Sequence, residues 1–309
     1  MRSTLLLAML GLVFAPMAWA QPATKNDSRI ETVIVTVPKY HFGVTPNAIA
    51  HDFVGYFATP TVLLGTIPRW HAGICPETRG LPPQIAEAVN QRLRKIAAQV
   101  GAPMKEAGCK PNLSITFTPE PQTLLDNIRK ENSLALGYHG ATTVSHPVQA
   151  WYETGIRDID GRTELDREPI GSTTFDDECH GSKGALPCWR APTSKIEGLA
   201  GRTGLNSDLL AVFIIVDTSK TGSYNVASVA DYIAMLALSR TEDYDDCQMM
   251  PSITNLLSYN CADKMKPDLV TASDIAYLRG VYRMESGAPL IVQQDQIAGE
   301  MANALAGGK

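Results

Sequence analysis

The apolar run LLAVFIIVDTS at residues 209–219 is the feature that most constrains the fold of this chain. An unbroken run of this kind predicts a strand that is buried on both faces, so helices must pack on its sheet. The next segment, SVADYIAMLALSR at 228–240, has apolar residues at helical spacing, and Ser228 is placed to cap its first turn. Together the two segments predict an α/β (α+β) fold, a mixed sheet packed by helices.

Further helices are predicted on both sides of this strand–helix pair. The clearest begins at Pro82 and Pro83 and ends at Gly101. Its buried stripe is predicted to consist of Ile85, Val89, Leu93, Ile96 and Val100. The remaining helices are expected at 119–132, at 270–284 with Thr271 as N-cap and Asp274 in the first turn, and at 293–306.

Strands are predicted where apolar and polar residues alternate. Segments 30–37 and 112–119 show this pattern, and in the second Leu113, Ile115 and Phe117 share one face. A short strand is expected at 62–67, and a strand-like piece near VQAWYET at 148–154.

Residues 1–20 are predicted to be a secretory signal peptide. Arg2 supplies the basic start, the apolar stretch LLLAMLGLVF follows, and AWA at residues 18–20 is a small-x-small cleavage site. This stretch is shorter than a membrane-spanning helix requires. We therefore expect cleavage near Ala20 and export to the periplasm or the extracellular space.

The mature chain is expected to form one domain. Removing 20 of the 309 residues leaves 289, enough for a sizeable core, and no repeat or linker divides them. We expect an N-terminal extension with a strand at 21–40 and a single domain at 41–309. Its segment at about 137–205, rich in Gly, Asp, Thr and Pro, is predicted to be a loop-rich insertion.

Charge and hydropathy bear on the partners of the chain. The formal net charge is −5 and no basic cluster is present, so nucleic acid is not an expected partner. No later apolar stretch is long enough to span a bilayer, so no membrane span is expected in the mature chain. The partner itself is not indicated, and a protein partner in the cell envelope is the class left open.

Cysteine use fits an exported chain. An even number of cysteines in such a chain favours disulfides over free thiols. Pairing between sequence neighbours would staple loops through Cys75–Cys109, Cys179–Cys188 and Cys247–Cys261. The alternative is a zinc–thiolate site, but the spacing contains no C-x-x-C pair.

Other chemistry-bearing residues do not form a recognisable site, and no cofactor is expected. The six histidines are His41, His51, His71, His139, His146 and His180. None of them makes an i, i+4 pair on a predicted helix. His139 and His146 flank a short loop and could approach each other. The acidic loop TEDYDD at 241–246 offers oxygen donors for calcium, but it lacks EF-hand spacing and is expected to be solvated. Asp217 is predicted to cap the turn after its strand, and no G-x-S-x-G motif is present.

The order of elements resembles the catalytic domain of zincin metallopeptidases, the metzincins most of all. The closing helix of that family is similar to LVTASDIAYLRGVY at 269–282, and PSITNLL at 251–257 stands where the family has its methionine turn, with Thr254 in the methionine position. The resemblance implies that the segment 228–240 corresponds to the active-site helix with its H-E-x-x-H motif. The three zinc-ligand positions and the general-base position are then held by Ala230, Ala234, Arg240 and Asp231.

The chain is also similar to an uncharacterised family of exported bacterial proteins that lacks the same ligands. This similarity rests on CPETRGLP at 75–82, GAP at 101–103, CKPNL at 109–113, DYIAM at 231–235 and SDIAYLRGVY at 273–282. It implies a degenerate zincin-like domain with no assigned activity.

The expected function follows from the missing ligands. Zincin catalysis needs two histidines one helical turn apart to hold zinc, and a glutamate that takes a proton from the zinc-bound water. Alanine methyl groups bind no metal, so zincin-type peptidase activity is not expected. The sequence instead predicts a pseudo-metallopeptidase that serves as a binding or structural envelope protein. The alternative is an envelope or extracellular hydrolase with a different active site.

Overall fold

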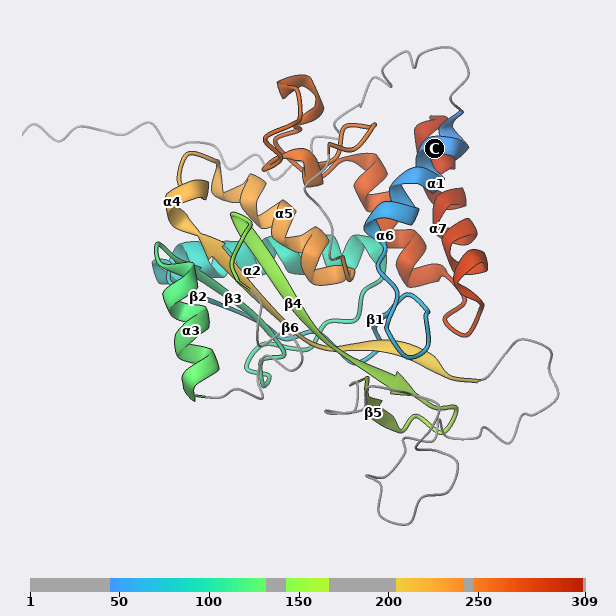
Figure 1. Ribbon diagram of the computed structural model, residues 1–309, viewed down its shortest axis with the longest axis horizontal. Helices are drawn as coiled ribbons and strands as arrows, with labels where there is room; N and C mark the ends of the chain where they lie inside the picture. Colours follow the sequence, from blue (N-terminus) through green and yellow to red (C-terminus); the bar gives the residue numbers. More distant parts are fainter. Residues whose placement is uncertain (1–44, 132–142, 167–203, 242–246, 308–309) are drawn as a thin grey trace, which may run out of the picture. The chain divides into compact units, whose positions relative to one another are not determined.

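The computed structural model describes residues 45–131, 143–166, 204–241 and 247–307, which belong to one compact unit, Val33–Lys309 (Figure 1). The fold is mixed α/β. Its strands are β1 Arg69–Trp70, β2 Pro76–Arg79, β3 Leu113–Thr118, β4 Val148–Arg157, β5 Thr163–Leu165 and β6 Asn206–Asp217. Its helices are α1 Pro46–Phe57, α2 Pro83–Val100, α3 Pro121–Glu131, α4 Thr218–Thr221, α5 Val226–Leu238, α6 Ala272–Arg283 and α7 Leu290–Leu305.

One mixed sheet organises the described part of the chain. Its strand order is β2-β3-β6-β4-β5, and β1 pairs with the beginning of β6. Strands β1, β2, β3 and β6 run parallel, whereas β4 is antiparallel to both β6 and β5. The long apolar strand β6 therefore lies inside the sheet, as an unbroken apolar run requires.

The two faces of the sheet are packed by different helices. Ile214 on one face joins the main core, to which α1, α2, α5, α6 and α7 contribute. The next residue, Ile215, points to the other face, where it packs with Trp151 and with Leu125 of α3. Strand β3 alternates as predicted, because Leu113, Ile115 and Phe117 are buried and the residues between them are half-buried.

Helix ends follow the predicted capping in two cases and differ in one. Gly101 ends α2 in the left-handed conformation with φ 81°, and Thr271 and Asp274 form a capping box at the start of α6. Helix α5 begins earlier than predicted, because Asn225 accepts the Ala227 N–H and is its N-cap. The expected Ser228 cap is wrong, since this residue is buried within the first turn.

Other differences have local causes. Ile85, expected in the buried stripe of α2, is 38% exposed in the first turn, and Ala86 takes the inward position. Segment 62–67 forms a turn at 62–64 and a bend at Thr66 rather than a strand, because Gly65 between them has a φ of 64°. Helix α1 was not predicted, although Thr45 caps it and Pro46 is its first residue.

Two of the three predicted disulfides are present. Cys75 and Cys109 join the start of β2 to the loop before β3, and Cys247 and Cys261 close the loop that follows α5. The third pair, Cys179–Cys188, lies outside the described residues, as does the predicted strand at 30–37. Strand β4 confirms the strand-like piece within 137–205.

Candidate functional site

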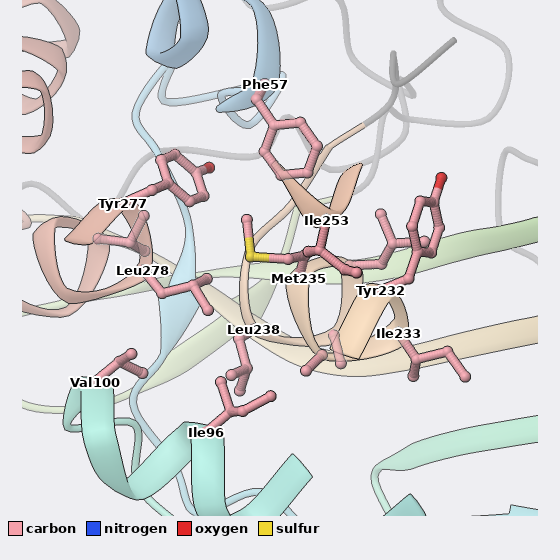
Figure 2. Packing of buried hydrophobic residues seen from close by; sticks show 14 of the residues in the cluster. Phe57, Ile96, Val100, Tyr232, Ile233, Met235, Leu238, Ile253, Tyr277 and Leu278 are labelled. Carbon is pink, nitrogen blue, oxygen red and sulfur yellow. The ribbon is translucent and has the colours of Figure 1, made fainter. Parts of the chain in front are cut away.

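Helix α5 is the element on which the sequence places a degenerate active site. Every residue from Ser228 to Arg240 is buried, so this helix presents no side chain to solvent beyond its first turn. Figure 2 shows Tyr232, Met235 and Leu238 of this helix among the apolar side chains that surround it. An amphipathic surface helix would have one polar face, and α5 has none.

Two of the three positions that the metzincin resemblance assigns to zinc ligands are alanines. Ala230 is 2% exposed and Ala234 is 0% exposed, and both belong to the main apolar core. Their side chains offer no lone pair to a metal ion. These two positions therefore contribute packing to α5 and no ligand chemistry.

Asp231, which the resemblance places at the general-base position, is bound by two neighbouring segments. Arg92 of α2 donates from Nε to Oδ1 at 2.5 Å and from Nη2 to Oδ2 at 2.7 Å. Oδ2 also accepts the backbone N–H of Val270, just before α6, at 2.8 Å. Hydrogen bonding to Asp231 raises the pKa of Arg92 against the opposing effect of burial. The carboxylate joins α5 to α2 and to the beginning of α6.

Arg240, which the resemblance places at the third ligand position, links two segments of the chain through hydrogen bonds. Its side chain is buried, and its guanidinium Nη1 donates to the Pro60 carbonyl. Its own carbonyl accepts the Thr59 N–H at 3.1 Å. Arg240 thus ties the end of α5 to the segment that follows α1.

The C-terminal end of α5 is closed by side-chain donors. A helix leaves its last carbonyls without partners inside the helix. Here those of residues 235–238 accept, in order, from Ser239 Oγ at 2.9 Å, Tyr152 Oη at 3.0 Å, Trp70 Nε1 at 2.7 Å and Tyr282 Oη at 2.8 Å. Burial raises the pKa of Tyr282, which keeps its hydroxyl protonated and able to donate. We call these four donors the α5 C-cap cluster.

The turn at Ile253–Asn255, which the resemblance matches to the methionine turn, is fixed against the start of α6. Asp274 accepts from Ser252 Oγ at 2.5 Å and from the Ile253 N–H at 3.0 Å, besides its capping contacts with Thr271. Burial raises the pKa of Asp274, and these hydrogen bonds act in the opposite direction. Thr254 is buried, and its hydroxyl pairs with Ser252 Oγ at 2.8 Å.

Those of the other candidates that the structure describes do not assemble into a site. Among the described residues, no group of three or more His, Cys, Asp or Glu side chains could hold a metal ion. His41, His139, His180 and residues 242–246 of the acidic loop lie outside them. Asp217 caps α4 as predicted, accepting the Ser219 N–H at 2.9 Å. Burial raises the pKa of Asp217. Hydrogen bonds from Ser219 and the charge of Lys220 together lower this pKa by more, so the net shift is downward.

Sequence reasoning missed the partners of α5. The sequence did not single out Arg92, and nothing in it linked Trp70 or Tyr152 to a helix end. One signal was present, since a single carboxylate in an otherwise apolar helix needs a buried cation or several donors. It identifies Asp231 as paired without naming its partner.

Comparisons with protein-family models, with curated proteins and with solved structures found no match. In the part of the chain that the structure describes, no helix has the length and apolar character needed to cross a membrane. The two disulfides are compatible with an exported protein.

Proposed function

We propose that this chain is an exported, non-catalytic relative of the zincin metallopeptidases that acts as a binding or structural protein of the cell envelope. The arrangement of elements supports the relationship. Strand β6 leads through the short α4 into α5, and the antiparallel strand β4 lies beside β6. The turn at Ile253–Asn255 belongs to the same core as α5, and α6 follows it in the chain. The proposed relationship rests on this succession, although β6 is an inner strand and not the edge strand of the resemblance.

The observation that carries the non-catalytic part of the proposal is the state of Asp231. A zincin general base must face a metal-bound water, whereas this carboxylate is fully buried and accepts three hydrogen bonds from Arg92 and Val270. The flanking Ala230 and Ala234 offer no ligand. Chemistry at these positions would require the ion pair to break and a charged group to lose its partners, which is energetically unfavourable.

The space beside the helix supports the same proposal. A peptide substrate of a zincin would lie between the antiparallel strand and the active-site helix. Here Tyr152 of β4 reaches across and donates to the Leu236 carbonyl, so strand and helix are joined directly. Binding by such a protein would then use its outer surface rather than a cleft along α5.

Metal content and hydrolysis together test this proposal. The protein purified after export would be analysed for bound metal by mass spectrometry, before and after incubation with zinc, and assayed on a mixed peptide library. We expect less than stoichiometric zinc and no zinc-dependent cleavage. Stoichiometric zinc whose removal abolishes a peptidase activity would overturn it.

A matched pair of variants sharpens the test. Asp231→Asn should lower thermal stability, whereas Asp126→Asn, which removes an exposed carboxylate paired with Arg129, should not. If Asp231 were a general base, Asp231→Asn would abolish hydrolysis while leaving the fold nearly as stable as before. N-terminal sequencing of the exported protein would test cleavage near Ala20.

A further inference from the structure

A charged cluster lies where β1, β4 and β6 meet (Figure 1). Asp208 of β6 is in register with Arg69 of β1 and with Gly155 of β4. Arg157, two residues beyond Gly155, lies on the same face of the sheet as Asp208, because strand side chains alternate. His71 follows β1 and is close enough to interact electrostatically with the Asp208 carboxylate.

The contacts of Asp208 account for only part of this cluster. Arg157 donates from Nε to Asp208 Oδ2 at 2.8 Å, and the two side chains are 17% and 7% exposed. Burial raises the pKa of Asp208, and the positive charges of Arg157, His71 and Arg69 act in the opposite direction. One carboxylate therefore faces two guanidinium groups and an imidazole, which leaves an excess of positive charge.

Arg69 is held in place by the end of a helix. Its Nη1 donates to the carbonyls of Tyr282 at 2.8 Å, of Met284 at 3.0 Å and of Val281 at 3.4 Å, which closes the C-terminal end of α6. Burial lowers the pKa of Arg69, and the nearby charge of Arg157 acts in the same direction. The helix end fixes this guanidinium close to a second one despite their mutual repulsion.

Both arginines keep donors that no described residue accepts. Arg157 uses only Nε in its hydrogen bond, and Arg69 uses only Nη1. Within the described residues, the one buried side-chain nitrogen or oxygen without a hydrogen-bond partner is Tyr277 Oη. The remaining nitrogens of Arg69 and Arg157 are therefore not fully buried, and both side chains are partly exposed. His71, whose side chain is exposed, lies beside them.

We propose that Arg157, Arg69 and His71 form a binding site for an oxyanion, with Asp208 orienting Arg157. The ligand class is a phosphate, sulfate or carboxylate group, because a planar guanidinium donates two parallel hydrogen bonds to such groups. The chain as a whole carries a net charge of −5, so attraction at this site comes from the cluster and not from the overall charge. The proposal stands independently of the proposed function.

Anion titration of the full exported protein tests this site. Binding of inorganic phosphate, sulfate and acetate would be followed by calorimetry at constant pH and ionic strength, with chloride as the reference anion. We expect saturable binding of at least one oxyanion, and the preferred one identifies the ligand class. The proposal fails if all three behave as chloride does.

Three variants locate the site. Arg157→Gln should weaken binding about tenfold or more, the effect of losing a charge-assisted hydrogen bond. Arg79→Gln is the matched control, because Arg79 also pairs with a carboxylate on the sheet, that of Glu77 at 2.7 Å, but stands on β2. If Arg157→Gln does not fold, His71→Ala, an exposed change, should weaken binding instead. Equal affinity of the Arg79 and Arg157 variants, or of His71→Ala and the unchanged protein, would overturn the assignment.

Discussion

Replacing Asp231 by asparagine tests the role of the buried ion pair most directly. The substitution preserves shape but removes the charge that receives two hydrogen bonds from Arg92. The asparagine can still accept the Val270 N–H, but its amide NH₂ then faces a guanidinium that also donates. Asp231 is 0% exposed and Arg92 is 25% exposed, so Arg92 recovers some hydration while the asparagine recovers none.

The expected loss of stability follows from these contacts. Breaking a fully buried ion pair costs about 3–5 kcal/mol, and the partial exposure of Arg92 places this pair at the lower end, about 3 kcal/mol. Such a loss is a large fraction of the unfolding free energy of a typical domain. For a unit of this size it corresponds to a decrease of roughly 6–12 °C in Tm.

Urea denaturation and calorimetry of the unchanged protein and the variant would measure this loss. The control is Asp126→Asn, whose exposed pair with Arg129 should contribute at most about 1 kcal/mol. A double-mutant cycle with Arg92→Leu should give a coupling energy of about 1–3 kcal/mol. A change below about 1 kcal/mol for Asp231→Asn, equal to that of the control, would refute the idea that this pair holds α5.

Three other predictions concern side chains around the same core. Tyr282→Phe should cost about 1 kcal/mol in urea denaturation, because the Leu238 carbonyl loses its donor. Tyr277→Phe should be neutral or stabilising, because the buried Tyr277 hydroxyl has no hydrogen-bond partner within 3.5 Å among the described residues. Equal losses would contradict this. Asp217→Asn should cost about 0.3–1 kcal/mol, because asparagine can still cap α4 but lacks the charge that pairs with Lys220 and favours the helix N-terminus. The pKa of Asp217 is lowered in the folded state. This difference in unfolding free energy should therefore be fully present above pH 3.8, the ordinary pKa, and be lost as pH falls through the lower folded-state pKa. A pH-independent difference would contradict the assignment. Cys247→Ser with Cys261→Ser removes the closure of a loop with a sequence separation of 14 and should cost about 3 kcal/mol, measured by urea denaturation against the unchanged, oxidised protein. No loss would show that contacts of the loop alone maintain it.

The elements that could be predicted are those with strong local patterns. Strand β3, strand β6 and helices α2, α5, α6 and α7 follow from apolar periodicity and from caps such as Gly101 and Thr271. The two described disulfides follow from the pairing of sequence neighbours. The short strands β1 and β2 could not be predicted, because two to four residues carry no periodicity and exist only through pairing with β6 and β3.

The candidate site could be located in part. The sequence placed Ala230, Asp231 and Ala234 on one helix, and the structure places them there. It could not show that Arg92 reaches Asp231, since the two are 139 residues apart and the contact depends on how α2 packs on α5. The charged cluster around Asp208 was missed for the same reason, because Arg69 and Arg157 meet only through strand register.

The α5 C-cap cluster has a consequence for how the chain folds. Trp70, Tyr152 and Tyr282 reach the helix end from sequence separations of 167, 84 and 44 residues. Until β1, β4 and α6 have all docked, three carbonyls at this end lack their protein donors, so the last turn of α5 is stable only in the complete unit. Amide hydrogens of this turn should therefore exchange with solvent only through global unfolding, at a common rate that reports the stability of the whole unit.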